Sequence, residues 1–144
     1  MSQLKHARSF KELIVYQKAR TVAKRIFVVT KRFPKEEMYS LTDQVRRSSR
    51  SVGAQIAEAW AKRRYEKHFA SKLTDADGEQ QETQHWIETA ADCDYLNPEE
   101  VRSLIDDLTE IGRMLNSMID KADSFCHETP FMIHDSSTEY FTDH

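Results

Sequence analysis

One spacing in this sequence matches part of a catalytic motif: Glu82-Thr83-Gln84-His85 places a Glu three residues before a His. Carboxylate-bridged di-iron bundles use this E-x-x-H spacing, because positions i and i+3 share one face of a helix. Such a site needs a second E-x-x-H and two further inward carboxylates, and the predicted helices contain no second copy. Glu82 and His85 also lie off the apolar stripe of their helix. We therefore predict no metal site.

Other enzyme motifs are missing from the sequence as well. It contains no G-x-x-x-x-G-K phosphate loop, no dinucleotide-binding G-x-G-x-x-G and no G-x-S-x-G nucleophile turn. Cys93 and Cys126 do not form a C-x-x-C, which argues against a zinc site or a disulfide framework. We predict a protein that is not an enzyme, with no catalytic residues, no cofactor and no small-molecule substrate.

Arginines of the predicted second helix form a row that suits phosphate binding. At about 100° per residue, Arg46, Arg50 and Arg64 project in nearly the same direction, over the small residues Gly53 and Ala57. Guanidinium groups can bind a phosphate with two donors at once. Together with neighbouring cations they give the candidate nucleic-acid-binding residues Arg46, Arg47, Arg50, Lys62, Arg63, Arg64 and Lys67.

The same row also suits an acidic helix. In an antiparallel pair that closes near residue 65, Arg50 falls opposite Glu79 and Arg46 falls near Glu82. The arginines would then form ion pairs within the protein or between subunits, and both interpretations stay open.

Four predicted helices position these residues. Ser9 and Glu12 fit a capping box, Pro34 ends the first helix, and Asn97 followed by Pro98 starts the last one. With only 3 Gly and 3 Pro, turns must be few and helices long. We predict an all-α, up-down-up-down antiparallel four-helix bundle over residues 1–124, with an irregular C-terminal tail over 125–144. The helices span about 9–33, 36–62, 66–94 and 97–124.

Two predicted helices carry unusual faces. The inward stripe of the third helix is predicted to consist of Phe69, Leu73, Ala76, Gln80, Thr83, Ile87 and Ala90. Its polar residues Gln80 and Thr83 must be hydrogen-bonded, hydrated or functional if they are buried. The first helix has apolar residues away from its main stripe. These form a candidate interface between subunits, made of Ile14, Val15, Val28 and Val29.

The charge is polarised along the chain, although the net charge is only −3. Residues 1–64 carry 16 Lys and Arg against 5 Asp and Glu, whereas residues 65–144 carry 5 against 19. Such asymmetry favours a nucleic-acid or other charged partner, or halves that neutralise each other. No apolar run is long enough for a membrane span, and the N-terminus lacks the apolar core of a signal peptide. A cytoplasmic protein with no membrane association is expected.

Several blocks of the sequence resemble a known family. They are residues 9–19 (SFKELIVYQKA), 33–37 (FPKEE), 39–48 (YSLTDQVRRS), 56–59 (IAEA) and 94–97 (DYLN). In this order they are similar to blocks of the four-helix-bundle proteins encoded in 23S rRNA intervening sequences. This S23-like family is related to the accessory variability protein of diversity-generating retroelements.

The resemblance implies a bundle that assembles as a ring-shaped homopentamer with a basic surface. In the retroelement relatives, that surface engages RNA and a reverse transcriptase. Arg46 and Arg47 match the family's paired arginines. Arg50 and Gly53 stand where the family usually has an apolar residue and a proline.

Two functions follow as hypotheses. The first is an oligomeric, non-catalytic protein whose basic first half contacts structured RNA or a nucleic-acid-processing protein. The second is a purely structural or protein-interaction ring, in which the arginines of the second helix pair with the acidic third helix.

Overall fold

The computed structural model describes residues 7–126, and these residues form helices with no strand among them. Along this part of the chain the helices are η1 (Phe10–Glu12), α2 (Ile14–Thr30), η2 (Lys35–Glu37), α3 (Leu41–Ala61), α4 (Glu66–Asp92), α5 (Pro98–Asp120) and α6 (Ala122–Cys126). The η helices are short 3-10 turns, and α6 is a single short helix.

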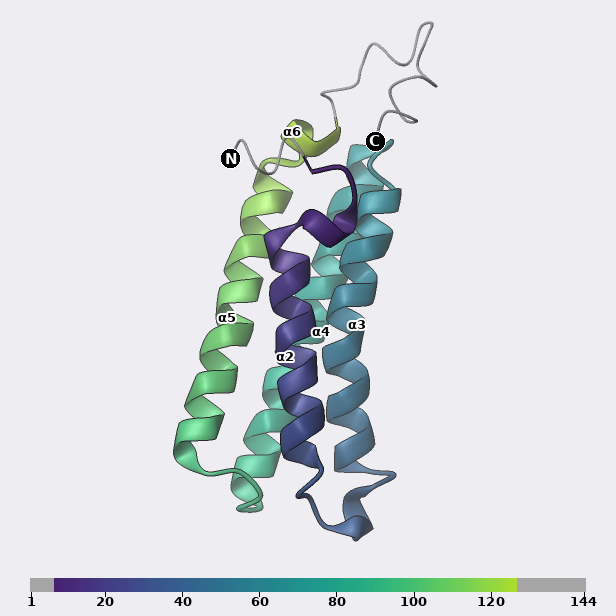
Figure 1. Cartoon of the computed structure of the whole chain (residues 1–144). Coiled ribbons are helices and arrows are strands. Elements are labelled where there is room, and N and C mark those ends of the chain that lie inside the picture. Colours follow the sequence, from purple (N-terminus) through teal and green to yellow (C-terminus); the bar gives the residue numbers. More distant parts are fainter. Residues whose placement is uncertain (1–6, 127–144) are drawn as a thin grey trace, which may run out of the picture.

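The four long helices alternate in direction and form one bundle. In Figure 1, α2 lies in front between α5 and α3, and α4 lies behind. α2 packs against α3 and α5, and α4 packs against the same two helices. The predicted all-α antiparallel four-helix bundle is therefore confirmed.

The first two helices begin later than predicted. Ser9 Oγ accepts a hydrogen bond from Lys11 N, and Glu12 Oε1 accepts one from Arg8 N, so these side chains cap the turn η1. Leu13 is then extended, with φ −71° and ψ 129°, and it is buried, so α2 starts only at Ile14. The predicted first helix, from residue 9, was wrong there because local hydrogen bonds of Ser and Glu can close a turn as well as a helix.

The second helix begins at Leu41 and not near residue 36, because η2 follows Pro34. Met38 precedes α3 as a result, and it is 45% exposed. Glu37 links this connection to the one between α4 and α5: its Oε1 accepts from Leu41 N and its Oε2 accepts from the Tyr95 hydroxyl at 2.9 Å. The latter bond is the main cause that raises the pKa of Tyr95 to about 12.

The core is filled as the periodicity predicts. Every inward residue expected on the third helix is buried in α4: Phe69, Leu73, Ala76, Gln80, Thr83, Ile87 and Ala90. The polar pair among them is hydrogen-bonded. Thr83 Oγ1 lies 2.8 Å from Ser48 Oγ of α3, and Gln80 Nε2 donates to Asp77 Oδ1 at 2.8 Å. Of the three possibilities for this polar layer, the structure shows the hydrogen-bonded one.

The bundle extends slightly beyond its predicted end. Asn97 and Glu100 form the capping box expected at the start of α5, with Pro98 in the first turn. Phe125 and Cys126, assigned to the tail, instead belong to α6 and are buried. Phe125 stacks on Phe69 with ring centroids 5.5 Å apart, which explains why the chain stays helical there. The rest of the predicted tail, 127–144, lies outside the described residues.

Candidate nucleic-acid interface

Cations on one side of α2 and its extension form ion pairs with acids of α5. Lys18 Nζ lies 3.5 Å from Glu110, Arg25 pairs with Asp107, and Arg32 Nη2 lies 2.6 Å from Glu100. These three basic residues are seven apart, so they lie on one side of α2 and its extension. Their partners follow α5 in the reverse order, as the antiparallel arrangement requires. The basic and acidic halves of the chain thus neutralise each other along the α2–α5 contact.

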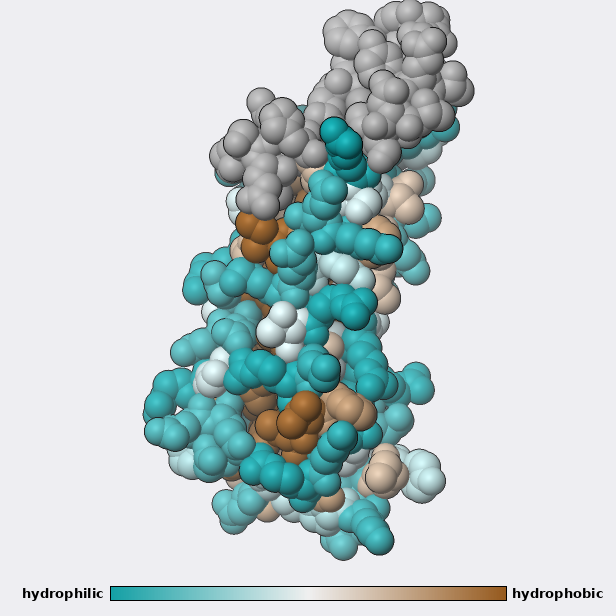
Figure 2. Space-filling model, in the orientation of Figure 1, coloured by the Kyte–Doolittle hydropathy of each residue, from teal (hydrophilic) through white to brown (hydrophobic). Residues whose placement is uncertain are grey.

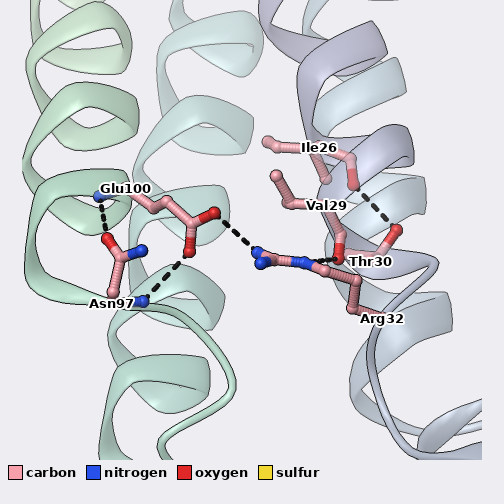
Figure 3. Close-up of polar contacts among 6 residues, drawn as sticks. All are labelled: Ile26, Val29, Thr30, Arg32, Asn97 and Glu100. Carbon is pink, nitrogen blue, oxygen red and sulfur yellow. Dashed lines mark hydrogen bonds and ion pairs between the residues drawn. The ribbon is translucent and has the colours of Figure 1, made fainter.

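Figure 3 shows the end of this row of ion pairs. Asn97 Oδ1 accepts from Glu100 N at 2.8 Å, and Glu100 Oε1 accepts from Asn97 N at 3.0 Å. The other oxygen of the same carboxylate binds Arg32. Glu100 therefore caps α5 and holds the end of α2 at once.

The arginines of α3 have different neighbours from those expected. Among residues 7–126, neither Arg46 nor Arg50 forms an ion pair with Glu79 or Glu82. Arg46 Nε donates to Thr30 Oγ1 at 2.8 Å, and its guanidinium lies 4.8 Å from the centroid of the Phe27 ring. The Arg50 guanidinium lies 5.6 Å from the same ring. The predicted ion pairs between these arginines and the third helix of the same chain were therefore wrong, whereas pairs between subunits stay a prediction.

The rotation of α3 explains this correction. The side of α3 that meets α4 carries Ser48, against Thr83, and Glu58, whose carboxylate lies 2.9 Å from Lys72 Nζ. Arg46 and Arg50 lie on another side of α3 and face α2. Projection at 100° per residue fixes directions around one helix only, and not which neighbour each direction meets.

The acids of α4 are accommodated without arginine. Burial is the main cause that raises the pKa of Glu79, and the charge of Glu82 adds to it. An arginine pair would have lowered this pKa. Glu82 Oε2 accepts from the Trp86 indole at 3.0 Å, and Lys72 lies between Glu58 and Asp75.

A groove of about 480 Å³ runs between α2 and α3, and we call it the α2/α3 groove. Aromatic side chains contribute to its wall: Tyr16 packs edge-on against Phe10 with ring centroids 4.9 Å apart, and Phe27 lies further along α2. The remaining lining is small or basic. It consists of Ala19, Arg20, Ala23, Lys24, Ser49, Arg50, Gly53, Ala54 and Ala57. Figure 2 shows apolar surface between hydrophilic side chains on the face of the bundle that carries α2.

The charges of the α2/α3 groove are of one sign. Arg20, Lys24 and Arg50 line it, and among residues 7–126 no Asp or Glu belongs to its lining. Within the described part of the chain, none of these three cations forms an ion pair. Arg20 Nη1 instead donates to the Tyr16 hydroxyl at 3.3 Å. The groove is thus an open, aromatic and cationic site on one side of α2.

The structure divides the predicted nucleic-acid-binding residues into separate groups. Arg46 and Arg50 lie beside the α2/α3 groove, whereas Arg47 is exposed and is not among the lining residues. The other four lie at the connection between α3 and α4, where Arg63 stacks over the Trp60 ring at 3.7 Å from its centroid. The connection itself contains Lys62, Arg63 and Arg64, and Lys67 lies in the first turn of α4.

Sequence reasoning did not assign Arg20, Lys24 or Phe27 to a site. A signal for them was present, because Tyr16, Arg20, Lys24 and Phe27 follow one another at helical spacing on α2. What was missing was the knowledge that this side of α2 faces Gly53 and Arg50 of α3.

The candidate interface between subunits needs one correction. Val15 is only 2% exposed and belongs to the core stripe of α2 with Ala19, Val22 and Ile26, so it was wrongly placed on a second face. Val28 is 51% exposed. Ile14 and Val29 are half-buried, and Ile14 lines a smaller groove between α2 and α5.

Neither a metal cluster nor a membrane span is found in the part of the chain that the structure describes. No group of three or more His, Cys, Asp or Glu residues could hold a metal ion there. Glu82 and His85 are both exposed, as expected from their position off the inward stripe. No helix among residues 7–126 is long and apolar enough to cross a membrane.

The family comparison covers most of the bundle. Residues 11–117 match the family described as 23S rRNA-intervening sequence protein. The chain belongs to this family. The match runs from η1 through most of α5, so it includes both helices of the α2/α3 groove and confirms the resemblance seen in the sequence.

The solved structure of one relative agrees with this assignment to the 23S rRNA-intervening sequence proteins. That protein, from Bacteroides thetaiotaomicron, is described as having unknown function and as a member of the S23 ribosomal protein family. It is 32% identical, with a TM-score of 0.67, and the similarity covers 74% of this chain and 96% of the relative. A comparison with curated proteins gave no match.

Proposed function

We propose that this protein is a non-catalytic RNA-binding or adaptor protein of the cytoplasm that binds structured RNA through its α2/α3 groove. The observation that carries the proposal is the contrast in charge around α2. Cations that face α5 form ion pairs with Glu110, Asp107 and Glu100, whereas those lining the groove form no ion pair among residues 7–126.

This local contrast matters more than the net charge. A chain of net charge −3 gives no overall attraction to a polyanion. A groove with cations of one sign and apolar walls nevertheless concentrates a positive potential where a ligand can enter. The adaptor form of the proposal uses the same surface to place RNA next to a nucleic-acid-processing protein.

The experiment is a titration of the full chain into a fluorescently labelled RNA stem-loop, followed by anisotropy at rising salt. Phosphate contacts release counterions, so the logarithm of the association constant should fall linearly with the logarithm of salt concentration, by about 0.7–0.9 per phosphate contacted. The absence of binding at low salt, or a constant that does not change with salt, would contradict the proposal.

The assembly state belongs to the proposal as well. We propose a homo-oligomer, a pentamer as the family resemblance implies, in which α2 contributes Ile14, Val28 and Val29. The support is Val28, a large apolar side chain that is 51% exposed in a single copy. Val28→Asp should give monomers in light scattering, with Ser71→Asp on α4 as an exposed control away from this face of α2. A persisting oligomer in V28D would contradict this interface.

A further inference from the structure

The apolar part of the α2/α3 groove is lined by small residues and by the aromatic rings of Phe10, Tyr16 and Phe27. Its small residues come from both helices, including Ala19 and Ala23 of α2 and Gly53 and Ala57 of α3. Its volume of about 480 Å³ lies in the range of about 300–1,000 Å³ that is typical of pockets for small ligands. A planar ring could enter where these side chains leave space.

The Tyr16 ring at this site is held in place. Its edge meets Phe10 at an interplanar angle of 83°, and its hydroxyl accepts from Arg20. A Cβ at position 53 would lie 3.5 Å from Tyr16 Cε1, so the ring rests close to the α3 backbone. A ring that is already ordered loses little entropy when a ligand stacks beside it.

Cations surround the other ring. Lys31 Nζ and the Arg46 guanidinium each lie 4.8 Å from the Phe27 centroid, and Arg50 approaches it as well. Planar guanidinium groups can stack on bases and can also donate to phosphates. Along α2 the cations Arg20 and Lys24 therefore lie between the Tyr16 and Phe27 rings, so the groove offers contacts for both the bases and the phosphates of a nucleic-acid strand.

We infer that the α2/α3 groove binds an unpaired base of single-stranded RNA beside Tyr16, while Arg20, Lys24 and Arg50 bind the flanking phosphates. This inference rests on the proposed function and names the ligand of its site. Single-stranded nucleic acid is held in this manner by stacking on aromatic rings in a basic groove. In a duplex the faces of the bases are already stacked, so a duplex can use only the cations.

The test fills the groove without changing its charge. Ala54 lines the groove and is exposed, so Ala54→Leu adds bulk there and keeps a good helix-forming residue. Ala61→Leu, at the exposed end of the same helix and outside the lining, is the matched control. Anisotropy is measured with labelled single-stranded rA12 and with the rA12·rU12 duplex, and circular dichroism checks that both variants are folded.

The expected result is that the wild type and A61L bind rA12 about tenfold more tightly than A54L does, because one stacked base is lost. Duplex binding and its salt dependence should be the same in all three proteins. A 2-aminopurine placed in the single strand should be quenched by the wild type and not by A54L.

Other outcomes separate the two claims. Equal affinity of A54L and wild type for rA12, with salt-dependent binding of both RNAs, would overturn the base-binding inference and leave the proposed function standing. If neither RNA binds, both claims are overturned. Binding of an acidic aromatic peptide but of neither RNA, blocked by A54L, would show that the groove takes a protein segment and would also overturn both.

Discussion

The two sides of α2 carry similar charge and have opposite environments. Toward α5, Lys18, Arg25 and Arg32 are paired with carboxylates. Toward α3, Arg20 and Lys24 line an open groove next to aromatic rings. A count of basic residues treats all five alike. What distinguishes them is which neighbouring helix each one faces.

The neighbouring helices explain the difference. Along the bundle axis, the acids of α5 lie level with the cations that they pair with. The side of α3 along the groove instead carries small residues and Arg50. On one side of α2 the cations are thereby paired with acids, and on the other side, among residues 7–126, they are not. We therefore expect a tightly packed helix contact and the α2/α3 groove to respond differently to added bulk. We also expect paired and unpaired cations to respond differently to lost charge.

The largest expected effect on stability comes from adding a methyl group at the tightly packed contact between α4 and α5. Gly112 of α5 is buried, and a Cβ there would lie 2.6 Å from Gln80 Nε2 and 3.1 Å from Asp77 Oδ1. Gly112→Ala should lower the free energy of unfolding by about 1–3 kcal/mol, because these hydrogen-bonded side chains must move. Urea denaturation measures the change.

Gly53, at the open groove, is the matched control. A Cβ there would make only ordinary contact with Tyr16, 3.5 Å away. Gly53→Ala should leave stability unchanged or raise it by up to about 1 kcal/mol, because Ala favours helix. Equal losses in G112A and G53A would show that the groove is closed as tightly as the α4–α5 contact.

A smaller effect is expected from the ion pairs. A double-mutant cycle on Arg32→Ala and Glu100→Gln should give a coupling energy of about 0.2–1 kcal/mol, because the pair is partly exposed. The coupling should shrink at high salt. Glu100→Gln keeps a side chain that can complete the capping box, which isolates the loss of charge. A coupling of zero at low salt would show that α2 is not held to α5 in this way.

The smallest effect concerns Glu79, which the structure leaves without an arginine. Its folded pKa is raised above the usual value of 4.5, mainly by burial. A raised carboxyl pKa means that the native state binds the proton more tightly, so this contribution to stability is complete below pH 4.5 and is lost as the pH rises through the folded pKa. Glu79→Gln should therefore raise Tm at neutral pH and match the wild type in acid. A lower Tm at neutral pH would indicate the arginine pairing that the sequence suggested.

The sequence predicted what each helix buries more accurately than where each helix begins. The inward stripe of α4, from Phe69 to Ala90, was predicted in full because one period continues through it without a break. The start of α2 was missed because Ser9 and Glu12 satisfy their hydrogen bonds in a 3-10 turn. Val15 was consequently counted on the wrong face.

The site was predicted only in part, because the pattern along one helix does not show which other helix each of its sides contacts. Arg46 and Arg50 were correctly grouped on one side of α3. Their partner was not predictable from angles around a single helix, since the packing of Ser48 against Thr83 decides how α3 is rotated. The contributions of Arg20 and Lys24 follow only when α2 is seen beside Gly53.

The central claim is that position around α2, and not charge alone, decides which cations bind RNA. The direct test compares two double variants that each remove two positive charges, Arg20→Gln with Arg50→Gln and Arg25→Gln with Arg32→Gln, in the same stem-loop titration against salt. We predict that the first pair binds RNA at least about tenfold more weakly, with a salt slope reduced by about 1.4–1.8 for two lost phosphate contacts, and that the second pair binds like the wild type. Equal losses in the two variants would contradict the account.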